Sequence, residues 1–236
     1  MLENDWAIFK LQFKIAMKER IVFFYTLVIP FIMLFINRTE DFQDNEALYV
    51  YWSYIVVITL LNGFLMQVIH LRESGSLKTL TYMTGSKTSI ILAVFLVQLL
   101  MIQLEIILFN LVVTLLVTHV SGLTILYGFL TSFLAATLCT AMLSGLMILK
   151  IKRTNFNLII NLFLLMGIIL LGIRPSGVLN YWLTVFNPFQ LIYGLYFLPM
   201  ASGTFKILVA SCTIIYLFIG IMILHKLSVK SRLKGA

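Results

Sequence analysis

The chain has 236 residues, of which 61% are hydrophobic and only 11% are charged, and its mean hydropathy is +1.04. A soluble domain is usually about 45–50% apolar and about 25% charged, so we expect lipid rather than water around this chain. This excludes a soluble enzyme, a nucleic-acid binder and a secreted disulfide scaffold. The net charge of +8 is interpreted as a topology signal, because the basic residues lie between apolar runs.

The first 20 residues are too charged to cross a bilayer, and they predict an amphipathic helix on the inner leaflet. Its aromatic face is formed by Trp6, Phe9 and Phe13. Its basic face is formed by Lys10 and Lys14. Cations on such a helix lie near anionic headgroups. The alternative is a membrane anchor without a further role.

Six apolar runs are long enough to be candidate transmembrane helices, since a bilayer core of about 30 Å requires roughly 20 helical residues. These runs are 21–37, 48–70, 88–118, 123–149, 155–173 and 206–225. The first run is short and contains Pro30, which predicts a kink. The third run is long enough to tilt or to project beyond the bilayer.

The distribution of Lys and Arg predicts the orientation. Of the 17 basic residues, 14 lie in the N-terminal segment, in the linkers 71–87 and 150–153, and in the C-terminal tail. The alternate connections contain only Arg38, Arg174 and Lys206, and the connection 38–47 is acidic. By the positive-inside rule, both termini are cytoplasmic and the chain crosses the membrane six times.

The linker 71–87 mixes apolar and polar residues, and Leu77, Leu80 and Thr84 fall on one helical face. A short helix lying crosswise against a cytosolic partner would have this pattern. The alternative is a solvated loop, which would leave many apolar side chains in water.

The third run is unusually polar, and it contains Gln98, Gln103, Glu105 and Asn110. Glu105 is the only ionisable residue well inside a run, and a central acid costs a few kcal/mol on insertion scales. These residues are candidates for the lining of a transport path. The alternative is a buried, hydrogen-bonded glutamate that holds helices together.

The segment 173–205 is apolar and aromatic, but it contains three of the four prolines. A seventh span here would place the basic tail outside the cell. Proline frees backbone partners that must be satisfied within lipid. We therefore expect a pair of broken, re-entrant or interfacial helices at the outer face, with its aromatic residues in an interfacial belt.

No catalytic or metal-binding pattern accompanies these elements. Gly85-Ser86-Lys87-Thr88 lacks the Gly spacing of a phosphate-binding loop, and His70, His119 and His225 are far apart. A row of small residues at four-residue spacing, Ser132, Ala136, Thr140 and Ser144, favours helix packing over catalysis. We expect no enzyme activity, metal or cofactor on this chain.

With these features the chain resembles the ABC-2-type permeases, the membrane subunits of ATP-driven exporters. The resemblance covers nearly the whole chain: the basic N-terminal helix, the proline Pro30 in the first span, the outer element Asn187-Pro188, and the linker sequence from Arg72 to Lys78, which is similar to the family's E-x-G-T-L-x-x-L signature. Ser74 and Gly85 depart from the family pattern.

The resemblance implies an all-α polytopic membrane protein with a single permease domain over residues 1–236. It implies that the linker is a coupling helix that docks on a separate ABC ATPase, with contacts from Arg72, Glu73, Gly75, Leu77, Lys78 and Leu80. It also implies ATP and Mg on that partner, a second permease subunit, and a place in the bacterial cell membrane.

The small outer loops resemble those of Gram-positive exporters of peptides or amphiphiles; polysaccharide exporters and drug-resistance pumps remain alternatives. Two other functions stay open from the sequence. One is a secondary transporter or channel driven by an ion gradient, and the other is an immunity or sensor protein without transport.

Overall fold

The computed structural model describes residues 2–18, 20–36, 46–116, 120–149, 153–172 and 177–228. Within these ranges the chain forms helices and no strand. The helices are α1 (Leu2–Lys18), α2 (Arg20–Ile36), α3 (Glu46–Thr59), η1 (Leu60–Leu65), α4 (Met66–Glu73), α5 (Ser76–Thr84), α6 (Lys87–Leu116), α7 (Gly122–Leu143), η2 (Ser144–Ile148), α8 (Arg153–Gly172), α9 (Val178–Phe186), α10 (Pro188–Phe197) and α11 (Gly203–Lys226). The fold is therefore all-α, as the composition predicts.

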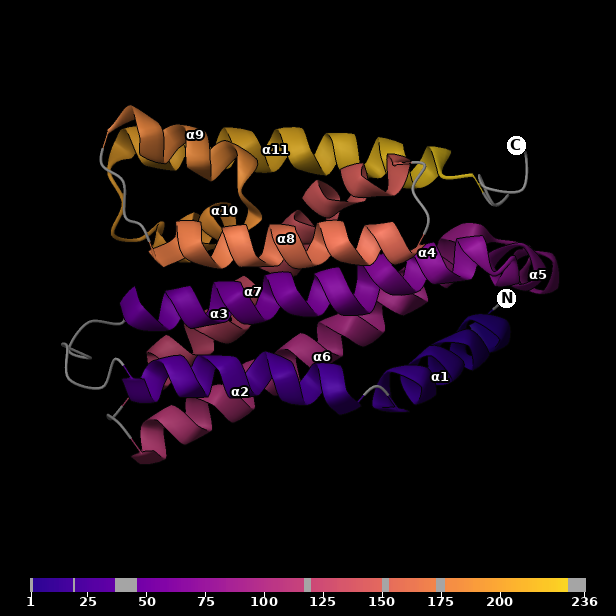
Figure 1. Cartoon of the computed structure of the whole chain (residues 1–236), viewed down its shortest axis with the longest axis horizontal. Coiled ribbons are helices and arrows are strands. Elements are labelled where there is room, and N and C mark those ends of the chain that lie inside the picture. The colour runs from indigo at the N-terminus through magenta and orange to yellow at the C-terminus, as the bar shows by residue number, and fades with distance from the viewer. Residues whose placement is uncertain are drawn as a thin grey trace.

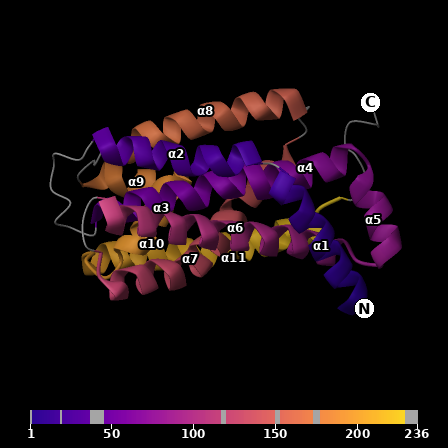
Figure 2. The same ribbon diagram turned by 90° about the horizontal axis from the view of Figure 1, so that it is seen from below.

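The long helices lie side by side along one axis (Figure 1). Helices α1, α4 and α5 and the last turns of α11 gather at one end of this bundle, which we call the α5 end. The start of α9, the end of α10 and the start of α11 lie at the opposite end, and the turn between α9 and α10 lies nearer the middle of the bundle. Seen from below, α5 runs across the bundle axis and α1 leaves it obliquely (Figure 2).

Four helices are long and apolar enough to cross a membrane: Ala47–Glu73, Lys87–Leu115, Gly122–Ile148 and Gly203–Lys226. These correspond to four of the six predicted runs and indicate a membrane protein. The apolar stretches Phe23–Phe35 and Asn155–Met166 are helical but shorter. Most of the predicted connection 38–47, most of the linker 150–153, residues 173–176 and the tail beyond 228 lie outside the described residues.

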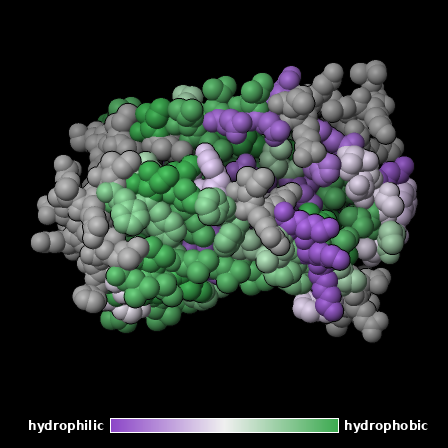
Figure 3. All heavy atoms as spheres, turned by 60° about the horizontal axis from the view of Figure 1, so that its bottom comes forward, coloured by the Kyte–Doolittle hydropathy of each residue, from purple (hydrophilic) through white to green (hydrophobic). Residues whose placement is uncertain are grey.

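The outer surface of the bundle is apolar. Figure 3 shows hydrophobic side chains over the face turned to the viewer, whereas hydrophilic residues gather toward the end that carries α1 and α5. Helix α11 has the least buried span, and its Ile207 and Ile214 are each 70% exposed. Side chains of this kind on the outside of a bundle are stable in lipid and costly in water.

The core is formed around α3 and η1, which contribute the buried aromatic residues Trp52 and Phe64. Helices α2, α6, α7 and α10 pack against α3. Between α3 and α4 the helix widens into the π-helix η1. Pro30 lies inside α2, which is helical on both sides of it.

The predicted broken element between the last two spans is a pair of helices that meet at Asn187 and Pro188. The side-chain oxygen of Asn187 accepts a 3.1 Å hydrogen bond from the Phe189 backbone N–H, and Pro188 occupies the first turn of α10. This arrangement is a favourable helix start, because proline lacks the donor that would be unsatisfied there.

The aromatic residues predicted to form an interfacial belt differ in their exposure. Trp182 and Phe186 on α9 are exposed, as a belt requires. Phe189 and Tyr196 on α10 are fully buried, so the prediction is wrong for them. The reason is that α10 enters the bundle and packs against α3 and α7.

The row of small residues on α7 faces other helices, as predicted for a packing surface: Ser132, Ala136 and Ser144 are fully buried and Thr140 is 5% exposed. The neighbouring Ala141 brings its backbone close to Gly220 of α11, where an added Cβ would lie 2.6 Å from the Ala141 Cα. Small side chains allow this close approach of two helices.

Candidate functional site

Residues 76–84 form the helix α5, so the linker is not a simple loop. Gly75 precedes the helix with φ +80° and Gly85 ends it with φ +75°. Glycine adopts this left-handed region without the strain that a Cβ would cause. The two glycines therefore set the sharp entry and exit that turn α5 across the bundle (Figure 2).

The inner face of α5 is anchored to its own chain. Leu77 is 1% exposed, and α5 packs against α4 and α6. Arg72, at the end of α4, is 3% exposed, and its Nη1 donates a 2.8 Å hydrogen bond to the backbone oxygen of Met147 in η2. The expectation that Leu77 and Arg72 contact a partner is thus corrected, because both are buried and instead hold α5 in position.

The outer face of α5 is open. Lys78 and Thr79 are exposed, and Tyr82 and Met83 are 79% and 72% exposed. The ammonium of Lys78 lies 5.7 Å from the centre of the Tyr82 ring. Gly75, Leu80 and Glu73 are partly exposed. We call Lys78, Thr79, Tyr82 and Met83 the outer α5 face.

Helix α1 has three faces. Ile8 and Gln12 are buried against the bundle, where α1 packs on α6. Phe9 stacks on Trp6 and on Phe13, and Trp6 is 57% exposed. Lys10 and Lys14 are exposed on the remaining face, with the Lys10 ammonium 5.3 Å from the Trp6 ring centre. An aromatic face beside a basic face suits a helix at a membrane surface.

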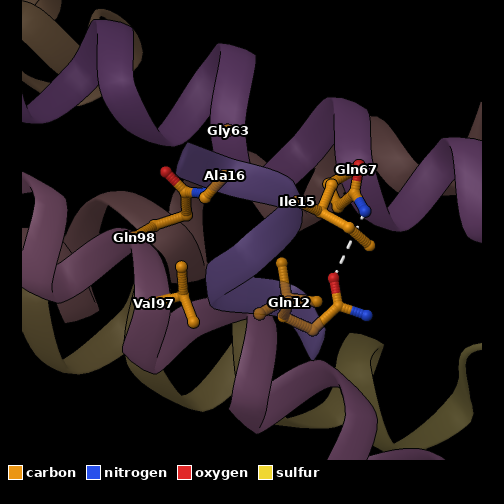
Figure 4. Close-up of a pocket in the computed structure, with 8 residues that line it drawn as sticks. Gln12, Ile15, Ala16, Gly63, Gln67, Val97 and Gln98 are labelled. Atoms are coloured by element: carbon orange, nitrogen blue, oxygen red, sulfur yellow. Dashed lines mark hydrogen bonds between the residues drawn. The ribbon is translucent and has the colours of Figure 1, made fainter. Parts of the chain in front are cut away.

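Three amide side chains from three elements surround a small cavity where α1 joins the bundle, and two of them face each other (Figure 4). Gln12 of α1, Gln67 of α4 and Gln98 of α6 line one small cavity together with Gly63 of η1. Gln67 Nε2 donates a 3.3 Å hydrogen bond to Gln12 Oε1. Gly63 has no side chain to obstruct Gln98, whose Oε1 would lie 2.0 Å from an added Cβ. Within this amide cluster the hydrogen bond joins α1 to α4, and Gln98 of α6 lies against Gly63 of the π-helix.

Glu105 lies on α6, two helical turns beyond Gln98, and is 1% exposed. Its Oε1 accepts a 2.7 Å hydrogen bond from the hydroxyl of Thr26 on α2. Its Oε2 accepts a 2.5 Å hydrogen bond from the hydroxyl of Thr59 on α3. The carboxyl group therefore bridges three helices, and its partner Thr59 directly precedes the π-helix.

The other polar residues of α6 face different helices. Gln103 Nε2 donates a 2.6 Å hydrogen bond to Ser132 Oγ on α7. Asn110 Oδ1 accepts a 2.9 Å hydrogen bond from the Trp52 indole on α3. Gln98, Gln103, Glu105 and Asn110 are all buried. Gln103, Glu105 and Asn110 thus form contacts between helices of this chain.

The most informative residues missed from the sequence are the partners of these groups. Thr26, Thr59 and Gly63 occur in apolar runs without a local signal of their role. The pair Asn62-Gly63 inside a span is the one visible irregularity, and it falls within η1. π-Helical turns of this kind occur often at functional positions.

Among the described residues, no group of three or more His, Cys, Asp or Glu side chains is placed to hold a metal ion. Cys139 and Cys212 are buried and free. Comparison of the chain with known protein families, curated proteins and solved structures finds no match.

Proposed function

We propose that this chain is the membrane-spanning permease subunit of an ATP-driven exporter of the ABC-2 type. The single observation that carries the proposal is α5: a short crosswise helix at one end of an apolar bundle, anchored by Leu77 and Arg72, with Tyr82 and Met83 exposed. Large apolar side chains exposed on an anchored helix suit a protein contact. The proposed partner is an ABC ATPase that binds ATP and Mg on its own chain.

The proposed topology has six spans, of which α2 and α8 are the two shorter ones. Their 17 and 20 residues correspond to about 26 and 30 Å of helix, close to the thickness of a bilayer core of about 30 Å. In this arrangement the α5 end and both termini are cytoplasmic. Asn187 and Pro188 then belong to a re-entrant element that enters from the outer face.

The proposed mechanism is alternating access in a pair of permease subunits. Closure of the ATPase dimer would displace α5, and Arg72 would pass this displacement to η2 through its hydrogen bond to Met147. Helix α1 is hydrogen-bonded to α4 through Gln12 and Gln67 and would move with it. ATP binding shifts the permease only because the ATPase contacts its two states differently.

The proposed substrate is a peptide or an amphiphile, which would enter a cavity between the two subunits from the inner leaflet. Described residues of α6 do not supply a continuous polar lining within one subunit, since Gln103, Glu105 and Asn110 bond to neighbouring helices. A lining for the substrate is therefore expected at the interface of the pair.

A second candidate is a transporter driven by an ion gradient. The observation that favours it is Glu105, a buried carboxyl group in the middle of a span with two hydroxyl partners. Proton-driven carriers use intramembrane acids of this kind. Export assays of Glu105→Gln and Glu105→Ala at matched expression separate the candidates: loss of transport in both supports a coupling role.

Two measurements test the proposal: the membrane topology of the chain and its association with an ATPase. Single cysteines at Met83 and Ser202 are labelled on intact cells with an impermeant thiol reagent, in a background with Cys139 and Cys212 replaced by Ser. The expected result is labelling of position 202 only. The solubilised protein should co-purify with a Walker-A-containing ATPase and transport in vesicles with ATP. Labelling at position 83, or transport driven by a pH gradient without ATP, contradicts the proposal.

A further inference from the structure

An apolar groove of about 530 Å³ runs between α6, α7 and α11 near the α5 end. Ligand sites commonly have volumes of about 300–1,000 Å³. Its walls include Phe64, Leu92, Phe95, Leu217, Ile221 and Leu224. The small residues Ala141 and Gly220 also line it, so the groove exists where α7 and α11 carry little side-chain volume.

One end of the groove is polar and positively charged. Thr88, Ser89 and His225 line it there. The ammonium of Lys87 donates hydrogen bonds to the backbone oxygens of His225 (2.5 Å) and Leu227 (3.0 Å), which fixes this cation beside the groove. Lys226 is exposed next to it.

Two further features make this end favourable for an anion. Helix α6 begins at Lys87, so the positive end of its dipole lies here, and of its first N–H groups that of Ser89 is bonded to the Ser86 hydroxyl (3.4 Å). The sequence has no Asp or Glu after Glu105, so α7, α11 and the remainder of the chain contribute no negative side chain.

Deeper in the groove, a buried hydroxyl has no hydrogen-bond partner within the chain. Thr140 is 5% exposed, lines the groove, and its Oγ1 is unsatisfied. Buried hydroxyl groups are nearly always hydrogen-bonded, because an unsatisfied one costs free energy. An acceptor on a bound molecule would supply the missing partner.

We propose that this groove binds one anionic phospholipid of the leaflet at the α5 end. An acyl chain lies along the apolar walls, an ester carbonyl accepts a hydrogen bond from Thr140, and the phosphate lies at Lys87 and the start of α6. This inference does not depend on the proposed transport function, because it rests only on the groove and its charges.

The test uses full-length protein, delipidated in detergent and then offered phosphatidylglycerol and phosphatidylcholine with identical acyl chains. Native mass spectrometry counts the retained lipid. The wild type should retain phosphatidylglycerol in preference to phosphatidylcholine, and Lys226→Gln should lower this preference about fivefold, as expected for one cation near an anionic headgroup.

A filling substitution locates the site. Thr137 lines the groove, so Thr137→Phe should reduce the retained phosphatidylglycerol about tenfold. Ile214→Phe adds an aromatic ring at a position of α11 that is 70% exposed and not part of the groove, and it should have no effect. Thr140→Val removes only the hydroxyl and provides a second test if Thr137→Phe folds poorly.

Three outcomes overturn the proposal. The first is equal retention of the two lipids by the wild type. The second is equal loss in Thr137→Phe and Ile214→Phe, which would place the lipid elsewhere. The third is a change of oligomeric state in Thr137→Phe without loss of lipid, which would mean that a second copy of the chain covers the groove.

Discussion

The hydroxyl of Thr59 donates a hydrogen bond to Oε2 of Glu105, at the residue that directly precedes the π-helix η1. Thr26 donates to the other oxygen of the same carboxyl group. One side chain of α6 therefore holds α2 and α3 together in the part of the bundle where the α-helix changes to the π-helix η1. Polar contacts between helices in lipid contribute about 0.6 kcal/mol on average and up to about 2 kcal/mol each.

Replacement of Thr59 by Val is expected to destabilise the protein by about 1 kcal/mol, because one carboxyl oxygen loses its donor within the bundle. Glu105→Leu should cost more, since it removes both contacts. Glu105→Gln should cost less than Glu105→Leu, because an amide still offers an acceptor oxygen and its NH₂ can donate to a threonine hydroxyl. Unfolding in detergent micelles measures each change.

A double-mutant cycle between Thr59 and Glu105 isolates the pair. A coupling energy of about 1 kcal/mol is expected. Ser53, which bonds only to the backbone oxygen of Val50 on its own helix, is the control: Ser53→Ala should show no coupling with Glu105. Equal coupling for Ser53 and Thr59 would refute the proposed bridge.

Two buried glycines should respond differently to an added methyl group. At Gly220 an added Cβ meets the backbone of Ala141, so Gly220→Ala must separate α7 from α11 and should cost about 1–3 kcal/mol. At Gly63 the Cβ meets only the end of the Gln98 side chain, which can rotate away. Gly63→Ala should therefore cost less, and Gln98→Ala should remove that cost.

Gly145 serves as the control for both, because a Cβ there meets nothing within 4 Å. Gly145→Ala should leave the free energy of unfolding unchanged or raise it by less than about 1 kcal/mol, through the lower chain entropy of the unfolded state. A cost at Gly145 as large as that at Gly220 would show that steric contact is not the cause.

Arg72→Ala should loosen α5 without unfolding the bundle. The substitution removes the donor to the Met147 backbone oxygen and should cost about 1–3 kcal/mol, because that oxygen is left unsatisfied. Hydrogen exchange of residues 74–86 should rise more than that of α6. Lys78→Ala, at an exposed position of α5, should leave both exchange rates at their wild-type values.

The sequence predicted the elements that local patterns encode. Three of the apolar runs correspond to α6, α7 and α11, and the mixed linker contains α5. Asn187-Pro188 lies at the start of α10. Each of these depends on residues that are close in the chain: hydrophobic length, flanking glycines, or a proline after a capping side chain.

The contacts between distant segments were not predictable in this way. Thr26 and Thr59 lie 79 and 46 residues from Glu105, and neither threonine stands out from its apolar run. The resemblance to the permease signature implied that Arg72 and Leu77 contact a partner, whereas packing against η2 and α6 buries them. The burial of Phe189 and Tyr196 likewise follows from where α10 inserts, which hydropathy does not encode.

The outer α5 face should separate folding from partner binding. Tyr82 and Met83 are largely exposed, so Tyr82→Ala and Met83→Ala should change the free energy of unfolding by less than about 0.5 kcal/mol. If the face contacts the proposed ATPase, the same substitutions should weaken binding about tenfold or more, because aromatic anchors dominate protein interfaces.

Trp182→Ala is the matched control, since Trp182 is 59% exposed but lies on α9, far from α5 in the bundle. It should leave ATPase binding at the wild-type level. Retention of the ATPase by the Tyr82→Ala, Met83→Ala double variant would exclude the outer α5 face as the docking surface, even where transport itself requires ATP.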